Sequence, residues 1–247
     1  MEIAPTLLLL FEVSQEEVRS KFDELLSKST DIDLGQIGRS GDSGSVLVFR
    51  GLTFQSEWNP KGALVSERRK VFSALCDEAV RSVLAVSPHA HIAGGLAVPE
   101  IAKIFLQFGA ICARTLGAVA VVWRSTALQS STDYFAEVVE SYAAGGVFPV
   151  LPIVDFAFEE PGLVQSKGLM EFCGQELKLR SDLLDQHELI RRAIRLAHDL
   201  ATNGAVESSQ DVPDLDVSYL MRLAPSDDCK FLHCRIILKT EQIVTLC

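Results

Sequence analysis

The sequence predicts a mixed α/β to α+β protein of two lobes, each a β-sheet with packed helices, the second lobe mainly antiparallel. Apolar runs of strand type alternate with amphipathic helical patterns through the first part of the chain. After residue 148 one strongly amphipathic helix stands among several short strands. The glycine pair and prolines at residues 145–152 are typical of a boundary. We therefore expect lobes at 1–147 and 148–247, with one continuous domain as the alternative.

The first lobe opens with a strand at residues 6–13, an apolar run that ends at Ser14. Ser14 and Glu17 have the spacing of a capping box, which predicts that an amphipathic helix begins there. Residues 29–45 are rich in Gly, Ser and Asp, and we expect them to form a loop. Residues 46–58 are apolar and β-prone, which predicts a strand or hairpin.

The rest of the first lobe alternates between helices and strands. Apolar residues recur every four positions in residues 66–83, which predicts a helix. Residues 89–98 are short and apolar and are expected to form a buried strand that turns into a helix, with Pro99 in the first turn. A strand at 118–123 and a helix at 133–142 complete the expected lobe.

The second lobe contains the clearest helix of the sequence. Asp185 and Glu188 have capping-box spacing at its amino end, and Gly204 follows its last apolar position. Strands are expected over residues 150–158, 162–180, 217–223 and 231–239.

The charge balance argues against nucleic-acid and membrane-surface binding. Aspartate and glutamate number 33 against 23 lysines and arginines, which gives a net charge of −10 that repels phosphate backbones and anionic lipid. The basic run at residues 68–70 is short. Arg191, Arg192 and Arg195 share their helix with acidic residues, so we interpret both groups as solvated faces.

The sequence has the features of a soluble cytoplasmic protein. Its amino end lacks the basic flank of a signal peptide, and the apolar stretch at residues 101–122 is interrupted by charged residues. Six cysteines without a CxxC pair are expected to be reduced, mostly buried thiols.

One string resembles a catalytic motif. Residues 41–44 read Gly-Asp-Ser-Gly, as around the nucleophile of trypsin-like proteases. That mechanism needs a histidine and an aspartate earlier in the chain, and no histidine precedes His89. We therefore expect a turn there. The glycines nearby form no phosphate-binding loop, so no cofactor is expected.

His89 and His91 are the best candidates for a metal site. On a strand, residues two apart share a face, but no further ligands with interpretable spacing accompany them, so a structural role is expected. Two other groups also lack the spacing of a metal site: His187 with His198, and Cys229 with His233 and Cys234. We therefore predict no bound metal.

Acidic residues for general acid–base catalysis are numerous in the second lobe: Asp155, Glu159, Glu160, Glu171 and Glu176. Glu171 and Glu176 stand out because they flank Gly174 in a segment that departs from a plain strand pattern. Exposed strand positions beside a glycine bulge are the favoured interpretation, and a catalytic pair is the alternative. The sequence therefore assigns no catalytic residue.

Several segments resemble an uncharacterised bacterial family, domain-of-unknown-function family 4261. The similarity spans residues 86–238, whereas residues 29–70 differ from it. It rests on Ala90-His91-Ile92 as a strand, on Thr115-Leu-Gly-Ala-Val-Ala-Val-Val-Trp-Arg-Ser-Thr-Ala-Leu-Gln, on Tyr134-Phe-Ala-Glu-Val-Val, and on Lys167-Gly168-Leu169 followed by Phe172, Gly174 and Glu176. The resemblance implies a bacterial cytoplasmic protein of mixed α/β fold and brings no activity or catalytic residues.

These observations favour a non-enzymatic binding protein. An acidic, motif-poor chain suits capture of a basic protein partner, as in an immunity or adaptor component of a bacterial toxin or secretion system. The alternatives are an enzyme on small molecules, with a carboxylate or histidine site assembled from distant residues, and a self-associating structural subunit. The sequence does not set the oligomeric state.

Overall fold

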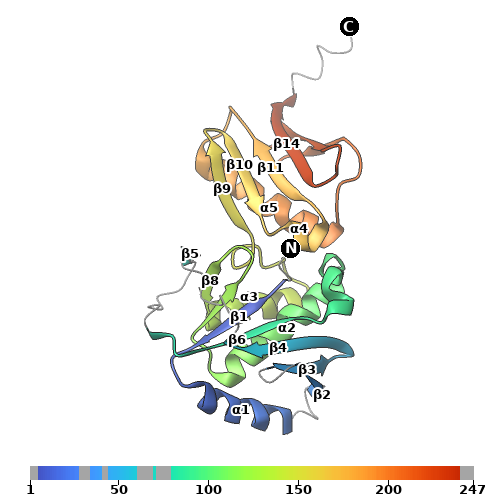
Figure 1. The fold of residues 1–247 in the computed structure, drawn as a ribbon. Helices are drawn as coiled ribbons and strands as arrows, with labels where there is room; N and C mark the ends of the chain where they lie inside the picture. Colours follow the sequence, from blue (N-terminus) through green and yellow to red (C-terminus); the bar gives the residue numbers. More distant parts are fainter. Residues whose placement is uncertain (1–4, 28–33, 41–43, 60–68, 71–78, 240–247) are drawn as a thin grey trace. The chain divides into compact units, whose positions relative to one another are not determined.

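The computed structural model describes residues 5–27, 34–40, 44–59, 69–70 and 79–239. It has the mixed α/β fold that the sequence predicts, with two sheets and packed helices (Figure 1). The chain divides into two compact units, Met1–Ile153 and Val154–Cys247. The sheet of the first unit has eight described strands and that of the second has six.

The sheet of the first unit is mainly antiparallel. Across the sheet its strands are β2 (Leu34–Ser40), β3 (Gly44–Phe49), β4 (Leu52–Trp58), β6 (Ser82–Pro88), β1 (Leu7–Phe11), β7 (Ala120–Trp123), β8 (Leu128–Ser131) and β5 (Arg69–Lys70). Among these strands β5 and β8 are parallel and all other neighbours are antiparallel. Alternation of strands and helices along the chain therefore does not produce a parallel sheet here.

Strand β1 forms the centre of the first unit. It pairs with β6 on one side and β7 on the other, and all five of its residues are fully buried. Because side chains alternate between the faces, Leu8 and Leu10 pack with apolar residues of β6 and β7 on one face. A strand buried on both faces needs an uninterrupted apolar sequence, which explains the run of four leucines and a phenylalanine.

The other face of this sheet packs against helices. The helices in the described part of the unit are α1 (Gln15–Ser27), the 3₁₀ helix η3 (Ala90–Ala97), α2 (Pro99–Leu116) and α3 (Thr132–Ala143). Helix α2 lies close to β1 at Gly109, where an added Cβ would lie 2.3 Å from Leu7 Cδ1. Phe54 of β4 stacks on Phe108 of α2 with ring centroids 4.9 Å apart. These contacts fix α2 against the middle of the sheet.

The helix ends follow their local sequence signals. Ser14 and Glu17 form the predicted capping box, since the Ser14 amide donates to the Glu17 carboxylate and the Glu17 amide donates to Ser14 Oγ. Pro99 starts α2, and Gly117 ends it in the left-handed conformation. No single helix in the described ranges is long and apolar enough to cross a membrane; η3 and α2 reach that length and composition only as a pair bent by 114°.

Three expectations for the first unit are wrong. Residues 34–40 form β2 instead of a loop, because a hairpin with β3 is held by the backbone ladder and needs few apolar side chains. The helix expected at 66–83 fails at residues 69–70 and 82–83, which are strand, while 71–78 lie outside the described residues. The strand expected from residue 89 is η3, and the buried strand, β6, precedes it.

The second unit has the mainly antiparallel sheet that the sequence predicts. Across the sheet its strands are β12 (Gln210–Pro213), β13 (Tyr219–Pro225), β14 (Phe231–Leu238), β11 (Glu176–Arg180), β10 (Leu163–Lys167) and β9 (Asp155–Glu160). Within it β11 and β14 run parallel, and the other neighbours are antiparallel. A short helix, α4 (Met170–Cys173), interrupts the strand expected at residues 162–180.

Helix α5 (Gln186–Asn203) packs on one face of this sheet, against β10 and β11 (Figure 1). Asp185 caps it by accepting a hydrogen bond from the Glu188 amide at 2.8 Å, as predicted. The buried side of α5 and the sheet face beneath it form the core of the unit, which includes Leu189, Ala193, Leu200, Leu177, Leu179, Leu232 and Met221. The opposite face of the same strands carries polar and charged residues.

Candidate functional site: an arginine row on the second sheet

Three arginines lie side by side on the second sheet, on the face opposite α5. Arg235 of β14 is in register with Arg180 of β11 on one side and with Arg222 of β13 on the other. Neighbouring strands are about 4.8 Å apart, so the three side chains originate within about 10 Å of one another. We call Arg180, Arg235 and Arg222 the arginine row.

The alternation of side chains along each strand places the row on the open face. Leu179, Cys234 and Leu223 come next to the arginines in the three strands and are buried in the core. The arginines therefore point the other way, and all three are exposed. Lys178 and His233 form the adjacent pair on the same face, two residues back along β11 and β14.

Carboxylates hold the outer cations of this surface in place. Arg222 forms two hydrogen bonds with Asp211 of β12, Nε to Oδ1 at 3.0 Å and Nη2 to Oδ2 at 3.1 Å, which raise the pKa of Arg222. At the other end, Arg180 pairs with Glu160 of β9. Lys178 Nζ lies 3.7 Å from Glu159 Oε2. Within the described residues Arg235 forms no ion pair, so the centre of the row is the unneutralised position.

The row borders a shallow, open hollow with a volume of about 460 Å³. Four cationic side chains line it together with Leu163, Ala224 and His233. Like charges opposite one another on neighbouring strands destabilise the pairing, and here Asp211 and Glu160 offset this effect for Arg222 and Arg180 but leave Arg235 without a counter-ion among the described residues. The feature therefore has an energetic cost that an anion in the hollow would reduce.

Cys234 borders the hollow but lacks the properties of a nucleophile. Burial raises the pKa of its thiol above the ordinary value, which keeps it protonated. Cys229 and His233, which are close to Cys234 in the sequence, differ from it in exposure: Cys229 sits in an exposed turn with φ of 57°, and His233 points to the open face. In the described ranges no group of three or more His, Cys, Asp or Glu residues is arranged to hold a metal ion.

His89 and His91 come together, but not on a strand. His89 precedes the 3₁₀ helix η3, and the turn brings the two Nδ1 atoms to 2.8 Å. At that distance one ring donates a hydrogen bond to the other. The pair lies on the surface of the first unit, and its rings are tilted by 51°.

Glu176 has a structural role in the second unit. Its carboxylate accepts hydrogen bonds from the amides of Gly168, Leu169 and Met170 at 2.7, 3.3 and 3.2 Å, and from Ser166 Oγ at 2.5 Å. Ser166 Oγ in turn accepts from the Leu177 amide at 2.7 Å. Glu176 therefore fixes the turn that enters α4, and Glu171 lies within α4 itself.

The other acidic candidates are also accounted for by local contacts. Asp155 accepts a hydrogen bond from the Phe156 amide at 2.9 Å. Glu159 and Glu160 pair with cations at the border of the hollow. Three residues of the protease-like string, at positions 41–43, lie outside the described residues. His187 and His198 lie on α5, about three turns apart.

The expectation that all three arginines of α5 lie on a solvated face is wrong for one of them. Arg191 and Arg195 are exposed, as expected, but Arg192 is only 4% exposed. Its Nε lies 3.0 and 2.8 Å from the two Oδ atoms of Asp214, whose side chain is fully buried, and its Nη1 lies 2.5 Å from Glu188 Oε2. The expectation was wrong because the β12–β13 connection covers this part of the helix and brings a carboxylate with it.

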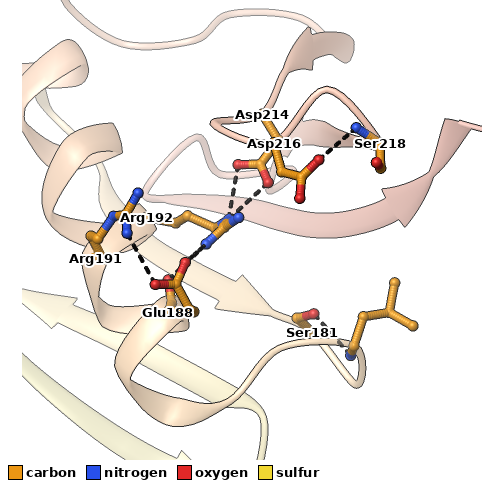
Figure 2. A network of polar contacts seen from close by, with 8 residues as sticks. Ser181, Glu188, Arg191, Arg192, Asp214, Asp216 and Ser218 are labelled. Carbon is orange, nitrogen blue, oxygen red and sulfur yellow. Dashed lines mark hydrogen bonds and ion pairs between the residues drawn. The ribbon is translucent and has the colours of Figure 1, made fainter.

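This ion network shifts three pKa values. Burial lowers the pKa of Arg192, but hydrogen bonds and charges from Asp214 and Glu188 outweigh it and raise the pKa overall. The hydrogen bond from Arg192 lowers the pKa of Glu188. The Ser218 amide, which donates to Asp216 Oδ1 at 2.8 Å, lowers the pKa of Asp216 (Figure 2). The network joins α5 to the β12–β13 connection.

Sequence reasoning missed the arginine row, although a signal for it was present. Lys178 and Arg180 are two apart on one expected strand, and His233 and Arg235 are two apart on another. Spacing by two predicts a shared face within each strand. Which strands are neighbours, and in what register, comes from the fold, because β11 and β14 are far apart in the sequence and pair in parallel.

Comparison with known proteins adds no relative, since no family model, no curated protein and no solved structure matches the chain.

Proposed function

We propose that the chain is a non-enzymatic binding protein that holds an acidic segment of a partner protein against the arginine row. The observation that carries this proposal is the register of Arg180, Arg235 and Arg222 across three neighbouring strands. Asp211 and Glu160 neutralise Arg222 and Arg180, so an acidic ligand gains most at Arg235, which forms no ion pair within the described residues. Recognition of acidic motifs by clustered arginines is a recurrent mode of protein binding.

The shape of the hollow supports a protein segment over a small molecule. Small-molecule sites enclose most of the ligand surface, whereas this hollow is shallow and open to solvent. Leu163 and Ala224 add apolar surface beside the cations. A chain segment with acidic and apolar side chains suits both features.

The net charge of −10 supports a different partner. Averaged over the molecule, the acidic excess favours a basic protein, because long-range attraction raises the rate of association. The local charge at the hollow is opposite in sign, and contacts at short range decide which ligand is held. A basic partner therefore remains a second candidate, on a surface other than the arginine row.

We place this activity in the bacterial cytoplasm, in an immunity or adaptor component of a toxin or secretion system. Support comes from the resemblance to domain-of-unknown-function family 4261 in residues 86–238. The four described cysteines are unpaired, which fits a reducing compartment. Burial raises the pKa of Cys173 to about 11 and that of Cys112 to about 12, as expected for packing residues.

A binding measurement with two matched double variants tests the proposal. The probe is a fluorescein-labelled deca-glutamate peptide, followed by fluorescence anisotropy at low and physiological salt. Arg222→Gln with Arg235→Gln removes two charges at the hollow. Arg191→Gln with Arg195→Gln removes two charges from the exposed side of α5. We expect the first pair to weaken binding about tenfold or more and the second less than about twofold.

Two results would overturn the proposal. Equal losses from both double variants would show that the probe responds to overall charge and not to the arginine row. Tighter binding of a single-stranded oligonucleotide of equal charge, with the same dependence on Arg235, would assign the surface to nucleic acid instead of a protein segment.

A further inference from the structure

We propose that the group recognised at the arginine row is a phosphate monoester on the partner's segment, and that Arg235 is its anchor. This inference rests on the proposed function and adds the chemical class of the bound group. It follows from how the hydrogen-bond donors of the three arginines are used.

The donors of Arg235 are the least used of the row. A guanidinium has five N–H donors, and within the described residues none of those of Arg235 has a side-chain partner. Arg222 uses Nε and Nη2 for Asp211 and retains Nη1. Arg180 uses Nη2 for Glu160. Unused donors therefore lie on both sides of a central, unpaired cation.

This arrangement fits a tetrahedral anion better than a planar one. A carboxylate has two oxygens in one plane and matches the fork of one arginine. A phosphate monoester has three terminal oxygens that point in different directions, so it can accept from Arg235 and from an arginine on either side at once. The row supplies three guanidinium groups where a carboxylate needs one.

The carboxylates that already pair with these cations also favour a phosphate monoester as the ligand. Glu159, Glu160 and Asp211 already pair with three of the four cations at the hollow. A ligand carboxylate has no advantage in charge over these, so it gains only the unpaired Arg235. A phosphate monoester carries about −1.5 to −2 at neutral pH and outcompetes them, while exposed ion pairs of this kind are weak and easily exchanged.

The experiment compares three peptide libraries of identical degenerate sequence. Their central residue is phosphoserine, glutamate or serine, and binding is measured by fluorescence anisotropy with the full chain. We expect the phosphoserine library to bind about tenfold or more tightly than the glutamate library. Arg235→Gln should remove most of this difference, whereas Arg195→Gln, the control on α5, should preserve it.

Two further measurements are needed. The first separates the role of the planar guanidinium fork from that of its charge, and the second separates binding of the phosphopeptide from binding of free phosphate. Arg235→Lys keeps the charge but loses the fork, so we expect an intermediate loss for phosphoserine and little change for glutamate. Inorganic phosphate and ADP serve as competitors, and we expect both to displace the phosphopeptide only weakly. Circular dichroism confirms that each variant is folded.

The outcomes distinguish this inference from the proposed function. Equal binding of the phosphoserine and glutamate libraries, both weakened by Arg235→Gln, would overturn phosphate recognition and leave the acidic-segment proposal standing. No binding of either library would overturn both. Displacement by ADP at concentrations as low as those of the phosphopeptide itself would assign the site to a small phosphorylated molecule and overturn the protein-segment part.

Discussion

Arg192 is a single residue whose environment differs from what its sequence neighbours indicate. It belongs to a helix with charged residues on several sides, yet its guanidinium is buried against the buried carboxylate of Asp214 (Figure 2). Replacing Arg192 with methionine leaves that carboxylate without its cation. We expect the free energy of unfolding of the second unit to fall by about 3–5 kcal/mol, measured by urea denaturation.

Two variants serve as controls for Arg192. Arg195→Met alters an exposed pair on the same helix, with 3.9 Å between Arg195 Nε and Asp199 Oδ2, and should cost less than about 0.5 kcal/mol. Arg192→Met combined with Asp214→Leu removes both charges and should recover much of the lost stability. Equal losses from Arg192→Met and Arg195→Met would contradict the buried pair.

The pKa values of three carboxylates predict sensitivity to acid. Glu188, Asp216 and Asp228 all have pKa values below the ordinary ones of 4.5 for Glu and 3.8 for Asp. A lowered folded-state pKa contributes stability above the unfolded-state pKa, and this is lost as the pH falls through the folded-state value. We therefore expect the free energy of unfolding to decrease as the pH falls below about 5.

The variant Glu188→Gln tests the source of this dependence. Its amide cannot titrate, so the stability of the variant should fall less steeply between about pH 5 and pH 2 than that of the parent. Urea denaturation at a series of pH values, followed by circular dichroism, gives both slopes. Parallel curves for the two proteins would show that Glu188 contributes nothing to the acid sensitivity.

At the scale of elements, Gly109 shows how closely α2 packs on β1. In an open helix Ala is more favourable than Gly by about 1 kcal/mol. Here the added methyl carbon would lie 2.3 Å from Leu7 Cδ1, and Leu7 is fully buried. We expect Gly109→Ala to lower the stability of the first unit by about 1–3 kcal/mol in thermal or urea denaturation.

A double variant distinguishes this clash from other effects of the substitution. Leu7→Val shortens the side chain that meets the new methyl group, and alone it should destabilise the core. In the Gly109→Ala background its cost should be smaller, or it should restore stability, which gives a coupling free energy between the two sites. Additive losses would show that the two residues do not meet.

The elements that could be predicted from sequence are those with strong local signals. The strand at β1, and helices α1, α2, α3 and α5, follow from apolar runs, caps and periodicity within one segment. Short strands such as β2, β8 and β12 escaped prediction because their identity depends on a partner strand. The sequence places residues 82–83 in the helix expected at 66–83 and assigns residues 84–88 to no element, because a run buried on both faces has no diagnostic period.

Candidate sites are also hard to predict from sequence, because their residues can come from strands that become neighbours only in the folded sheet. Glu176 stood out because it and Glu171 flank Gly174, and the structure assigns it to the turn before α4, where it accepts four hydrogen bonds. The arginine row has no local signal beyond alternation within a strand. Its members come from three strands whose neighbours are set by the whole sheet, so a sequence pattern alone cannot bring them together.

At the scale of the whole molecule, the positions of the tryptophans allow the unfolding of the two units to be followed separately. Both tryptophans of the chain, Trp58 and Trp123, lie in Met1–Ile153. They are buried in β4 and β7, in contact with aromatic rings of that unit. Tryptophan fluorescence therefore reports unfolding of the first unit, whereas far-ultraviolet circular dichroism reports helices and strands of both.

We expect the two units to unfold as separate cooperative transitions, because each has its own sheet, helices and buried core. Arg192→Met should shift part of the circular dichroism curve to lower urea and leave the fluorescence midpoint in place. Gly109→Ala should shift the fluorescence midpoint and leave the second component of the dichroism curve in place. An equal shift of the fluorescence and dichroism midpoints by Arg192→Met would contradict separate transitions. A substitution in Val154–Cys247 would then control the stability of both units, which would mean that they unfold as one.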